Sequence, residues 1–146
     1  MLHALELIAT LCAGLFSGAA LYVNLVEHPA RMGLGTCNAF SQWAPSYKRA
    51  TWMQAPLALL SSIAGTGAWL MGGGTAWLVA AALIGAVVPF TFIVIMPTNQ
   101  KLLTPGRDIS SSDTHTLLEN WGKLHAVRSV LSFMATVLCI WLLLGA

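Results

Sequence analysis

Long stretches without a charged residue alternate with short polar segments along this chain. No Asp, Glu, Lys or Arg occurs in residues 7–26, 50–100 or 129–146. A helix needs about 20 mostly apolar residues to cross a bilayer, so the outer stretches fit one crossing each and the middle stretch fits two, divided by the glycine run at 72–74. The pattern predicts an all-α fold, a four-transmembrane-helix bundle in a single domain (1–146), with spans at about residues 4–27, 50–71, 76–96 and 117–145.

The segment between the first two spans, residues 28–49, is mixed in character. Phe40, Trp43 and Tyr47 recur in it at helical spacing, and basic residues lie at both ends. Trp and Tyr favour the boundary between lipid and water. We therefore expect a short interfacial helix here, in the first cytoplasmic loop, and Trp43 and Tyr47 serve there either as interfacial anchors or as walls of a site.

The composition narrows the class of protein. Hydrophobic residues make up 57% of the chain and charged residues 8%, whereas a soluble domain carries about 25% charged residues. A chain this apolar requires membrane lipid as its surroundings. A net charge of +2, with no basic run interleaved with aromatic residues, argues against nucleic acid as a partner.

The basic residues predict the orientation. All seven Lys and Arg residues lie in the two long loops or at the start of the fourth span. By the positive-inside rule these loops are cytoplasmic. Because the number of spans is even, both termini are then non-cytoplasmic, and the chain is an integral, multi-pass membrane protein.

Two glycines in the first span favour close helix packing. Gly14 and Gly18 have G-x-x-x-G spacing, which lets another helix approach closely. The partner is either another helix of the same bundle or a second copy in a homo-oligomer.

Polar residues inside spans are costly, so they are candidates for function. At the end of the first span, Asn24 and His28 lie four apart, as do Glu27 and Arg31, and each pair would meet on a continuous helix. Glu27 or His28 would act as acid, base or ligand. Alternatively, Glu27 and Arg31 form an ion pair that ends the span. Asn99, at the end of the third span, is a candidate ligand or part of a terminating turn.

The fourth span opens with a polar stripe. Trp121, His125, Arg128, Ser129 and Ser132 fall on one face of a helix. Lipid-facing packing does not require such a stripe. The alternative is that Arg128 reaches out to the interface and His125 bonds a loop.

These residues indicate no cofactor, and the alternative is a metal ion. His28, His125 and Glu27 supply imidazole and carboxylate groups, which suit Zn, Fe or Cu. The three residues come from different spans, so their spacing is not diagnostic of a site. No soluble-enzyme motif such as a P-loop occurs.

Three short motifs resemble one known family. They are W-x-x-x-Y (Trp43, Tyr47), M-P-T-N-x-x-L (residues 96–102) and W-x-x-x-H-x-x-R (Trp121, His125, Arg128). This combination is similar to the four-span membrane-protein family that includes the fungal anthrone oxygenases. Members oxidise anthrones to anthraquinones with dioxygen, without a familiar cofactor.

The resemblance implies a role for each residue of these motifs. His125 would be the base, because a histidine titrates near neutral pH. Arg128 and Asn99 would stabilise the anion that results, and Tyr47 would bond a substrate oxygen. Trp121 and Trp43 would stack on a flat, apolar aromatic substrate.

Three functions stay open. The first is an oxygenase of polycyclic phenolic, anthrone-type or quinol-like substrates at a pocket near the cytoplasmic face, with Glu27, His28 and Arg31 in its substrate-binding wall. The second is a non-catalytic binding protein or carrier for a quinone, a lipid or a metal ion. The third is a structural subunit that assembles through Gly14 and Gly18.

Overall fold

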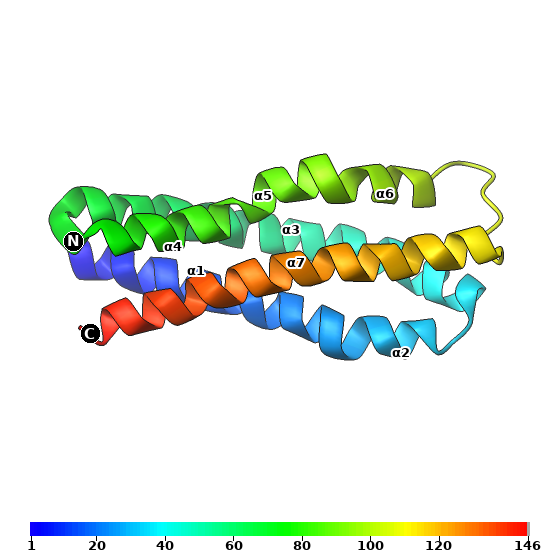
Figure 1. Cartoon of the computed structure of the whole chain (residues 1–146), viewed down its shortest axis with the longest axis horizontal. Helices are drawn as coiled ribbons and strands as arrows, with labels where there is room; N and C mark the ends of the chain where they lie inside the picture. The colour runs from blue at the N-terminus through cyan, green and yellow to red at the C-terminus, as the bar shows by residue number, and fades with distance from the viewer. Residues whose placement is uncertain (146) are drawn as a thin grey trace.

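Four long helical rods make up the computed structural model, which describes residues 1–145 (Figure 1). The rods comprise Leu2–Met32, Thr36–Gly73, Thr75–Leu102 and Ser112–Leu143, and each is long and apolar enough to cross a membrane. Within residues 1–145 there is no strand. The all-α, four-helix prediction is confirmed, and each rod extends beyond the predicted span at one end or both because polar turns continue the helices.

Each rod is divided into segments. In chain order they are α1 (Leu2–Tyr22), the π-helical turn η1 (Val23–Glu27), α2 (His28–Met32), α3 (Thr36–Ala68), the π-helical turn η2 (Trp69–Gly73), α4 (Thr75–Gly85), α5 (Val87–Phe90), the π-helical turn η3 (Thr91–Ile95), α6 (Met96–Leu102) and α7 (Ser112–Leu143).

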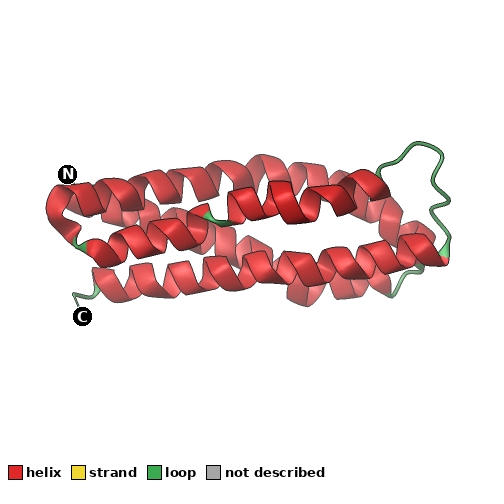
Figure 2. Cartoon of the chain, turned by 45° about the horizontal axis from the view of Figure 1, so that its top comes forward, coloured by secondary structure: helices red, strands yellow, loops and turns green. Residues whose placement is uncertain are grey.

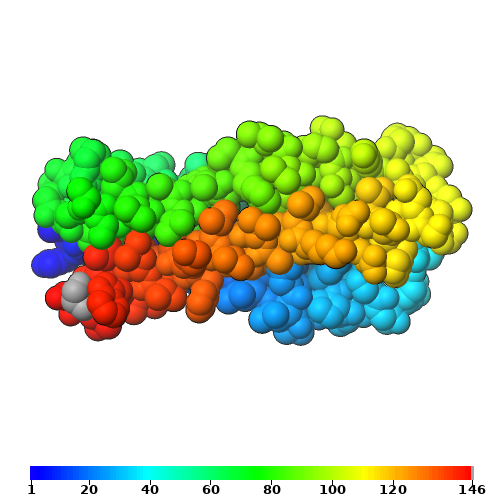
Figure 3. Space-filling view, in the orientation of Figure 1, coloured from blue at the N-terminus to red at the C-terminus, as the bar shows by residue number. Residues whose placement is uncertain are grey.

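The rods alternate in direction. Helix α1 packs on α3 and α7, and α4 packs on the same two helices, so α1 and α4 lie diagonally across the bundle. Both chain ends lie at one end of the bundle, and the connections 33–35 and 103–111 lie at the other (Figures 1 and 2). We call these the glycine-turn half and the loop half. Figure 3 shows α7 along one face, with α4–α6 on one side of it and, in the loop half, the end of the first rod on the other.

Glycine and proline account for the breaks in the third rod and the turn before it. Gly72 and Gly74 have φ values of 90° and 94°, which a residue with a Cβ adopts only with strain. The glycine turn was predicted from the sequence. Pro89 has no N–H to donate to Gly85 in the preceding turn, and α4 ends at Gly85. The visible step between α4 and α5 in Figure 1 follows.

The predicted interfacial helix in the first loop is not a separate element. Residues 36–49 form the first turns of α3, which continues without interruption to Ala68. Pro45 and Pro56 lie inside this helix without ending it. Trp43 is fully buried, so it is not an interfacial anchor. The aromatic spacing indicated a helix correctly, but the side chains face the bundle.

Small residues bring the rods together in the glycine-turn half. Ala9, Ala64, Ala68 and Ala80 are buried there around Trp77. On the outside, large apolar side chains are exposed along all four rods, as lipid contact requires.

The two glycines of the first rod differ in their surroundings. A Cβ added at Gly14 would lie 3.8 Å from Thr136 of α7, whereas one at Gly18 would meet nothing within 4 Å. Gly14 therefore packs inside the bundle. Assembly of two copies through this face stays a prediction.

Candidate functional site

Polar and aromatic side chains converge inside the loop half. They come from three elements: η1–α2, the first turns of α3, and α7. On α7 the predicted stripe faces inward, because Trp121, His125, Ser129 and Ser132 are all buried. The helical spacing predicted this shared face correctly.

A hydrogen-bond network fixes the ring of His125. Its Nδ1 lies 2.7 Å from Oδ1 of Asn24, and the hydroxyl of Ser129 donates to the same oxygen at 2.5 Å. The amide nitrogen of Asn24 donates to the carbonyl of Gly122 at 3.0 Å. Because that bond orients the amide, Asn24 presents an acceptor, and His125 must carry its proton on Nδ1. The other ring nitrogen, Nε2, is then an acceptor.

Asn24 and His28 were expected to meet on an ordinary helix. Residues 23–27 form a π-helical turn, and Asn24 bonds His125 and Gly122 of α7. The second expected pair, Glu27 and Arg31, does form an ion pair.

His28 packs directly against α7. A Cβ at Gly122 would lie 2.5 Å from Cδ2 and Nε2 of His28, so only glycine allows this approach. The His28 ring lies 5.3 Å from the ring of Trp121. The Nδ1 of His28 is buried and has no hydrogen-bond partner among residues 1–145.

The ion pair of Glu27 and Arg31 forms one wall of the site. The Arg31 side chain is 2% exposed, and its guanidinium carbon lies 5.8 Å from the centre of the Trp121 ring. Gln42 and Ser46 of α3 also donate to Glu27, at 2.8 and 2.6 Å. The predicted pair is therefore built into the contact between the first two rods and does more than end the first span.

The aromatic rings of α3 and α7 form a continuous cluster. Trp43 stacks on Tyr47 at 5.3 Å and meets Trp121 edge-on at 5.9 Å. Trp121 in turn lies 4.9 Å from the ring of His125. Trp43 is fully buried beneath these rings, so Tyr47 and Trp121 are the aromatic residues that can reach a ligand.

Arg128 turns into the bundle. Its Nη2 donates to Oε1 of Gln54 at 2.9 Å, and its guanidinium carbon lies 5.4 Å from the centre of the Phe16 ring. The alternative of a side chain reaching outward is therefore wrong. Nε of Arg128 is buried without a partner in the described chain, as is Nε2 of Gln54.

These groups surround a small central cavity of about 20 Å³. The residues lining it are Val23, Arg31, Ser46, Tyr47, Ala50, Thr51, Gln54, Trp121, His125 and Arg128. About 10–15 Å³ holds one water molecule, so the cavity has room for one molecule of the size of water or dioxygen. A polycyclic compound does not fit inside it.

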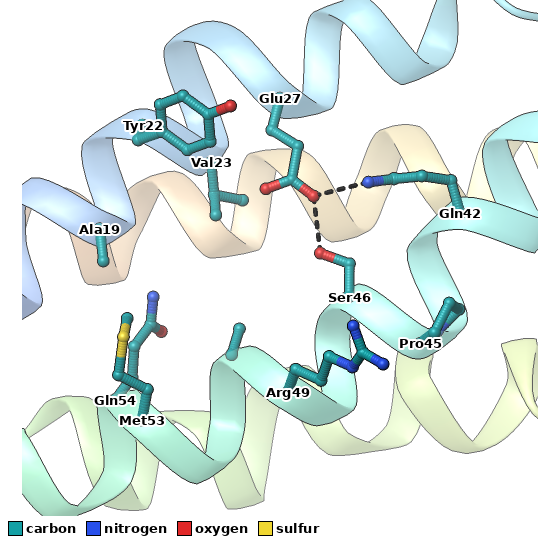
Figure 4. A pocket seen from close by; sticks show the side chains of 11 residues that line it. Ala19, Tyr22, Val23, Glu27, Gln42, Pro45, Ser46, Arg49, Met53 and Gln54 are labelled. Atoms are coloured by element: carbon teal, nitrogen blue, oxygen red, sulfur yellow. Dashed lines mark hydrogen bonds between the residues drawn. The ribbon is translucent and has the colours of Figure 1, made fainter.

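A larger, open pocket of about 540 Å³ adjoins the central cavity (Figure 4). It lies between the first rod and α3, and we call it the lateral pocket. It shares four lining residues with the central cavity: Val23, Ser46, Ala50 and Gln54. Its volume falls in the range of small-molecule sites, roughly 300–1,000 Å³.

Two predicted features are not part of this arrangement. Asn99 is 1% exposed, but it does not line the central cavity, and neither amide atom has a partner within residues 1–145. The proposed metal ligands His28, His125 and Glu27 do not come together. No group of three His, Cys, Asp or Glu residues in the described chain is placed to hold a metal, because Glu27 faces α3 and His125 faces Asn24.

Two residues of the site were missed by sequence reasoning. Gly122 and Ser46 act through contacts with other rods, and nothing in the local sequence distinguishes them. Asn24 and Gln54 can be singled out from the sequence, because both are polar residues in stretches without charge. The spacing alone did not indicate which residues they contact.

Comparison with known proteins identifies similar sequences. A family model described as anthrone oxygenase matches residues 43–138. Over 70 residues the chain is 36% identical to the anthrone oxygenase tpcL of Aspergillus fumigatus, a match that covers 46% of this chain and 44% of that protein. No solved structure matches. The family match includes Tyr47, Trp121, His125 and Arg128 and begins after Asn24, Glu27, His28 and Arg31.

Proposed function

This chain belongs to the anthrone oxygenase family, and we propose on that basis that it oxidises a polycyclic phenol of the anthrone or quinol type with dioxygen. The observation that carries the proposal is the convergence of Tyr47, Trp121, His125 and Arg128 on one cavity inside the loop half. A base, a cation and a hydroxyl group at one small cavity match what such a reaction needs.

His125 is the base. With Nδ1 donating to Asn24, its Nε2 lone pair takes the proton from the ring carbon opposite the ketone when that edge of an anthrone reaches the central cavity from the adjoining lateral pocket. The negative charge that results is shared with the ketone oxygen. A positioned base contributes roughly 10²–10⁴ to the rate.

Arg128 and Tyr47 stabilise that anion. Arg128 has a buried Nε–H without a partner in the described chain, and Tyr47 lines the same cavity. Donors held in place in a low-dielectric site stabilise developing charge without reorganisation. The aromatic rings of Trp121 and Tyr47 provide faces against which a flat ring system packs.

Dioxygen is the oxidant and needs no further co-reactant. The carbanion transfers electrons to dioxygen and forms a carbon–oxygen bond, and His125 returns its proton to the outer oxygen. Loss of the second proton from the same carbon forms the carbonyl, breaks the O–O bond and releases hydroxide, which takes up that proton. One anthrone and one dioxygen thus give one anthraquinone and one water, and the carbon loses four electrons that dioxygen gains.

The test is oxygen uptake by the purified protein in lipid nanodiscs supplied with an anthrone. The expected result is one anthraquinone formed per dioxygen consumed, at a rate that His125→Ala lowers by at least about 100-fold while the helical content is unchanged. Turnover that persists at the wild-type rate in His125→Ala would remove His125 from the mechanism. No uptake by the wild-type protein would refute the oxygenase.

A second candidate is a binding protein or carrier for a quinone or a lipid. It is favoured by the contrast in volume between the lateral pocket, about 540 Å³, and the central cavity, about 20 Å³. A ring system held in the lateral pocket lies outside the cavity that His125 lines. This function predicts saturable binding of a quinone, one per protein, with no oxygen consumed when an anthrone is offered. A carrier of metal ions would show the same saturable binding with the metal alone.

The orientation proposed from the basic residues places the loop half at the cytoplasmic face. Cys37 is the exposed cysteine of this half, while Cys12 and Cys139 are buried. A membrane-impermeant maleimide is expected to label Cys37 only from the cytoplasmic side, and Cys37→Ser is expected to abolish the signal. Labelling of Cys37 in intact cells from outside would show that the orientation is the opposite one.

A further inference from the structure

Gln54 and Glu27 lie on opposite walls of the lateral pocket, and each has a polar atom without a hydrogen bond from the described residues (Figure 4). The guanidinium of Arg49 also lines the pocket. Gln54 extends from α3, and Glu27 extends from the end of η1. Most of the remaining lining is apolar, including Ala19, Val23 and Met53. A pocket with an apolar lining and a few placed polar groups is typical of sites for small molecules.

Gln54 presents a donor. Its Oε1 accepts from Arg128 at 2.9 Å, and this fixes the orientation of the amide. Its Nε2 is buried without a partner within residues 1–145, although Gln54 is only 2% exposed. In Figure 4 the amide nitrogen points from α3 into the space between the helices. An unpaired buried donor is costly, and a ligand with an acceptor oxygen would satisfy it.

Glu27 presents an acceptor. Arg31, Gln42 and Ser46 all donate to one of its oxygens, Oε1. The other oxygen, Oε2, receives no hydrogen bond from the described residues, and Figure 4 shows it directed away from Gln42 and Ser46. Because Arg31 keeps the carboxylate ionised and fixed, Oε2 accepts strongly from a hydroxyl group.

The pocket also adjoins the cavity that the proposed catalytic residues line. Gln54 lines both the lateral pocket and the central cavity, together with Val23, Ser46 and Ala50. A ring system in the pocket therefore lies beside the cavity that His125 and Arg128 line. The hydrogen bond from Arg128 to Gln54 links the two spaces.

We propose that the lateral pocket binds a flat phenolic ketone, whose carbonyl oxygen accepts from Gln54 Nε2 and whose phenolic hydroxyl donates to Glu27 Oε2. The choice of a flat ring system rests on the proposed function. The pairing of one acceptor and one donor rests on the geometry of the pocket. Ligands without oxygen cannot form a hydrogen bond with Gln54 or Glu27, so the site selects hydroxylated ketones over hydrocarbons of the same shape.

Equilibrium binding of a dihydroxyanthraquinone to the protein in nanodiscs tests this site without any turnover, because the compound is already oxidised. Two variants act on the pocket. Ala19→Phe fills it, and Gln54→Glu keeps an acceptor for Arg128 while removing the donor. We expect one saturable site in the wild type and at least tenfold weaker binding in both variants. Anthracene, which has no oxygen, is expected to show no saturable binding.

The matched control fills a second groove of equal size. The groove lined by Val79, Phe133 and Trp141 also measures about 540 Å³, and all of its lining side chains are apolar. Val79→Phe is expected to bind the dihydroxyanthraquinone as the wild type does. Wild-type binding in both Ala19→Phe and Gln54→Glu would overturn the proposal, as would a loss of binding in Val79→Phe alone.

Oxygen uptake with an anthrone, measured on the same samples, separates the two proposals. Wild-type turnover in Ala19→Phe and Gln54→Glu would leave the oxygenase standing and overturn the lateral pocket as its substrate site. Saturable binding that both variants weaken, without any oxygen uptake, would support the pocket and refute the oxygenase.

Discussion

The two halves of the bundle are built from the same four rods but differ in how their interiors are filled. In the glycine-turn half, alanines and glycines let the helices approach closely, and the buried hydroxyl group of Ser61 bonds a backbone carbonyl. Ser61 donates to the carbonyl of Ala9 at 2.8 Å, and a Cβ at Gly65 would lie 3.1 Å from that of Ala81. In the loop half, Trp, His, Arg, Gln and Glu side chains occupy the interior instead.

Unsatisfied polar atoms distinguish the halves most clearly. Every buried side-chain nitrogen or oxygen without a partner in the described chain belongs to the loop half. The residues concerned are His28, Arg31, Trp43, Gln54, Asn99, Trp121 and Arg128. Each such group costs about 1–3 kcal/mol. Helix packing does not require these unpaired polar groups. The glycine-turn half therefore mainly stabilises the bundle, and the loop half carries the candidate site.

The largest effect is expected from Arg128→Leu. Removal of one donor to a developing anion typically lowers kcat about 10²–10³-fold, and leucine retains the apolar contact with Phe16. The measurement is turnover of an anthrone in nanodiscs. Arg107→Leu is the control, because Arg107 pairs with Asp113 in the second loop and its loss should leave turnover unchanged. Equal losses in both variants would contradict a specific role for Arg128.

Asn24→Leu is expected to lower turnover by roughly 10–100-fold, the usual loss when a residue that orients a catalytic group is removed. Without the amide acceptor, the proton of His125 is no longer held on Nδ1. Nitrogen chemical shifts of the labelled imidazole distinguish the two tautomers. Ser132→Ala, a buried change one turn beyond Ser129, should alter neither turnover nor tautomer. An unchanged tautomer in Asn24→Leu would show that Asn24 does not orient the ring.

Gly65→Val is expected to act on the other half. The added side chain forces α3 and α4 apart, and overpacking of this kind costs about 1–3 kcal/mol. The midpoint of thermal unfolding in detergent should fall, while turnover per folded molecule stays at the wild-type value. Gly18→Val, where a Cβ meets nothing within 4 Å, is the matched control. Equal unfolding midpoints for Gly65→Val and Gly18→Val would show that close packing at Gly65 does not stabilise the bundle.

The smallest effect is expected in the second loop, outside the membrane spans. The hydroxyl and backbone N–H of Ser110 donate to Asp108 at 2.6 and 2.9 Å, and they lower the pKa of that carboxyl. A depressed pKa means that the carboxylate stabilises the loop above the unfolded pKa and loses that effect as the pH falls through the folded pKa. Hydrogen exchange of the Ser110 amide should rise about two- to tenfold in Asp108→Ala, and turnover should stay the same. A large loss of turnover in Asp108→Ala would show that this loop contributes to the site.

The sequence was sufficient to predict the fold because uncharged stretches and glycines act locally. The stripe of Trp121, His125 and Arg128 was predictable for the same reason, since one helix fixes which side chains share a face. The family resemblance drawn from the short motifs is likewise confirmed.

Contacts between rods could not be predicted in this way. The bond from His125 to Asn24 joins residues 101 positions apart and depends on how the first rod packs on α7. Gln54 is a polar residue within an uncharged stretch, but its bond to Arg128 depends on how α3 and α7 cross. Asn99 is buried in the loop half but does not line the central cavity, so the role that its motif suggested stays a prediction.

The most direct test of this division is turnover per folded molecule for one variant from each half, His125→Ala and Gly65→Val, with thermal unfolding measured on the same samples. We expect His125→Ala to lower anthrone oxidation at least about 100-fold and to unfold at the wild-type temperature. Gly65→Val should unfold at a lower temperature, and its folded fraction should turn over at the wild-type rate. Wild-type turnover in His125→Ala, or lost turnover in fully folded Gly65→Val, would contradict this division.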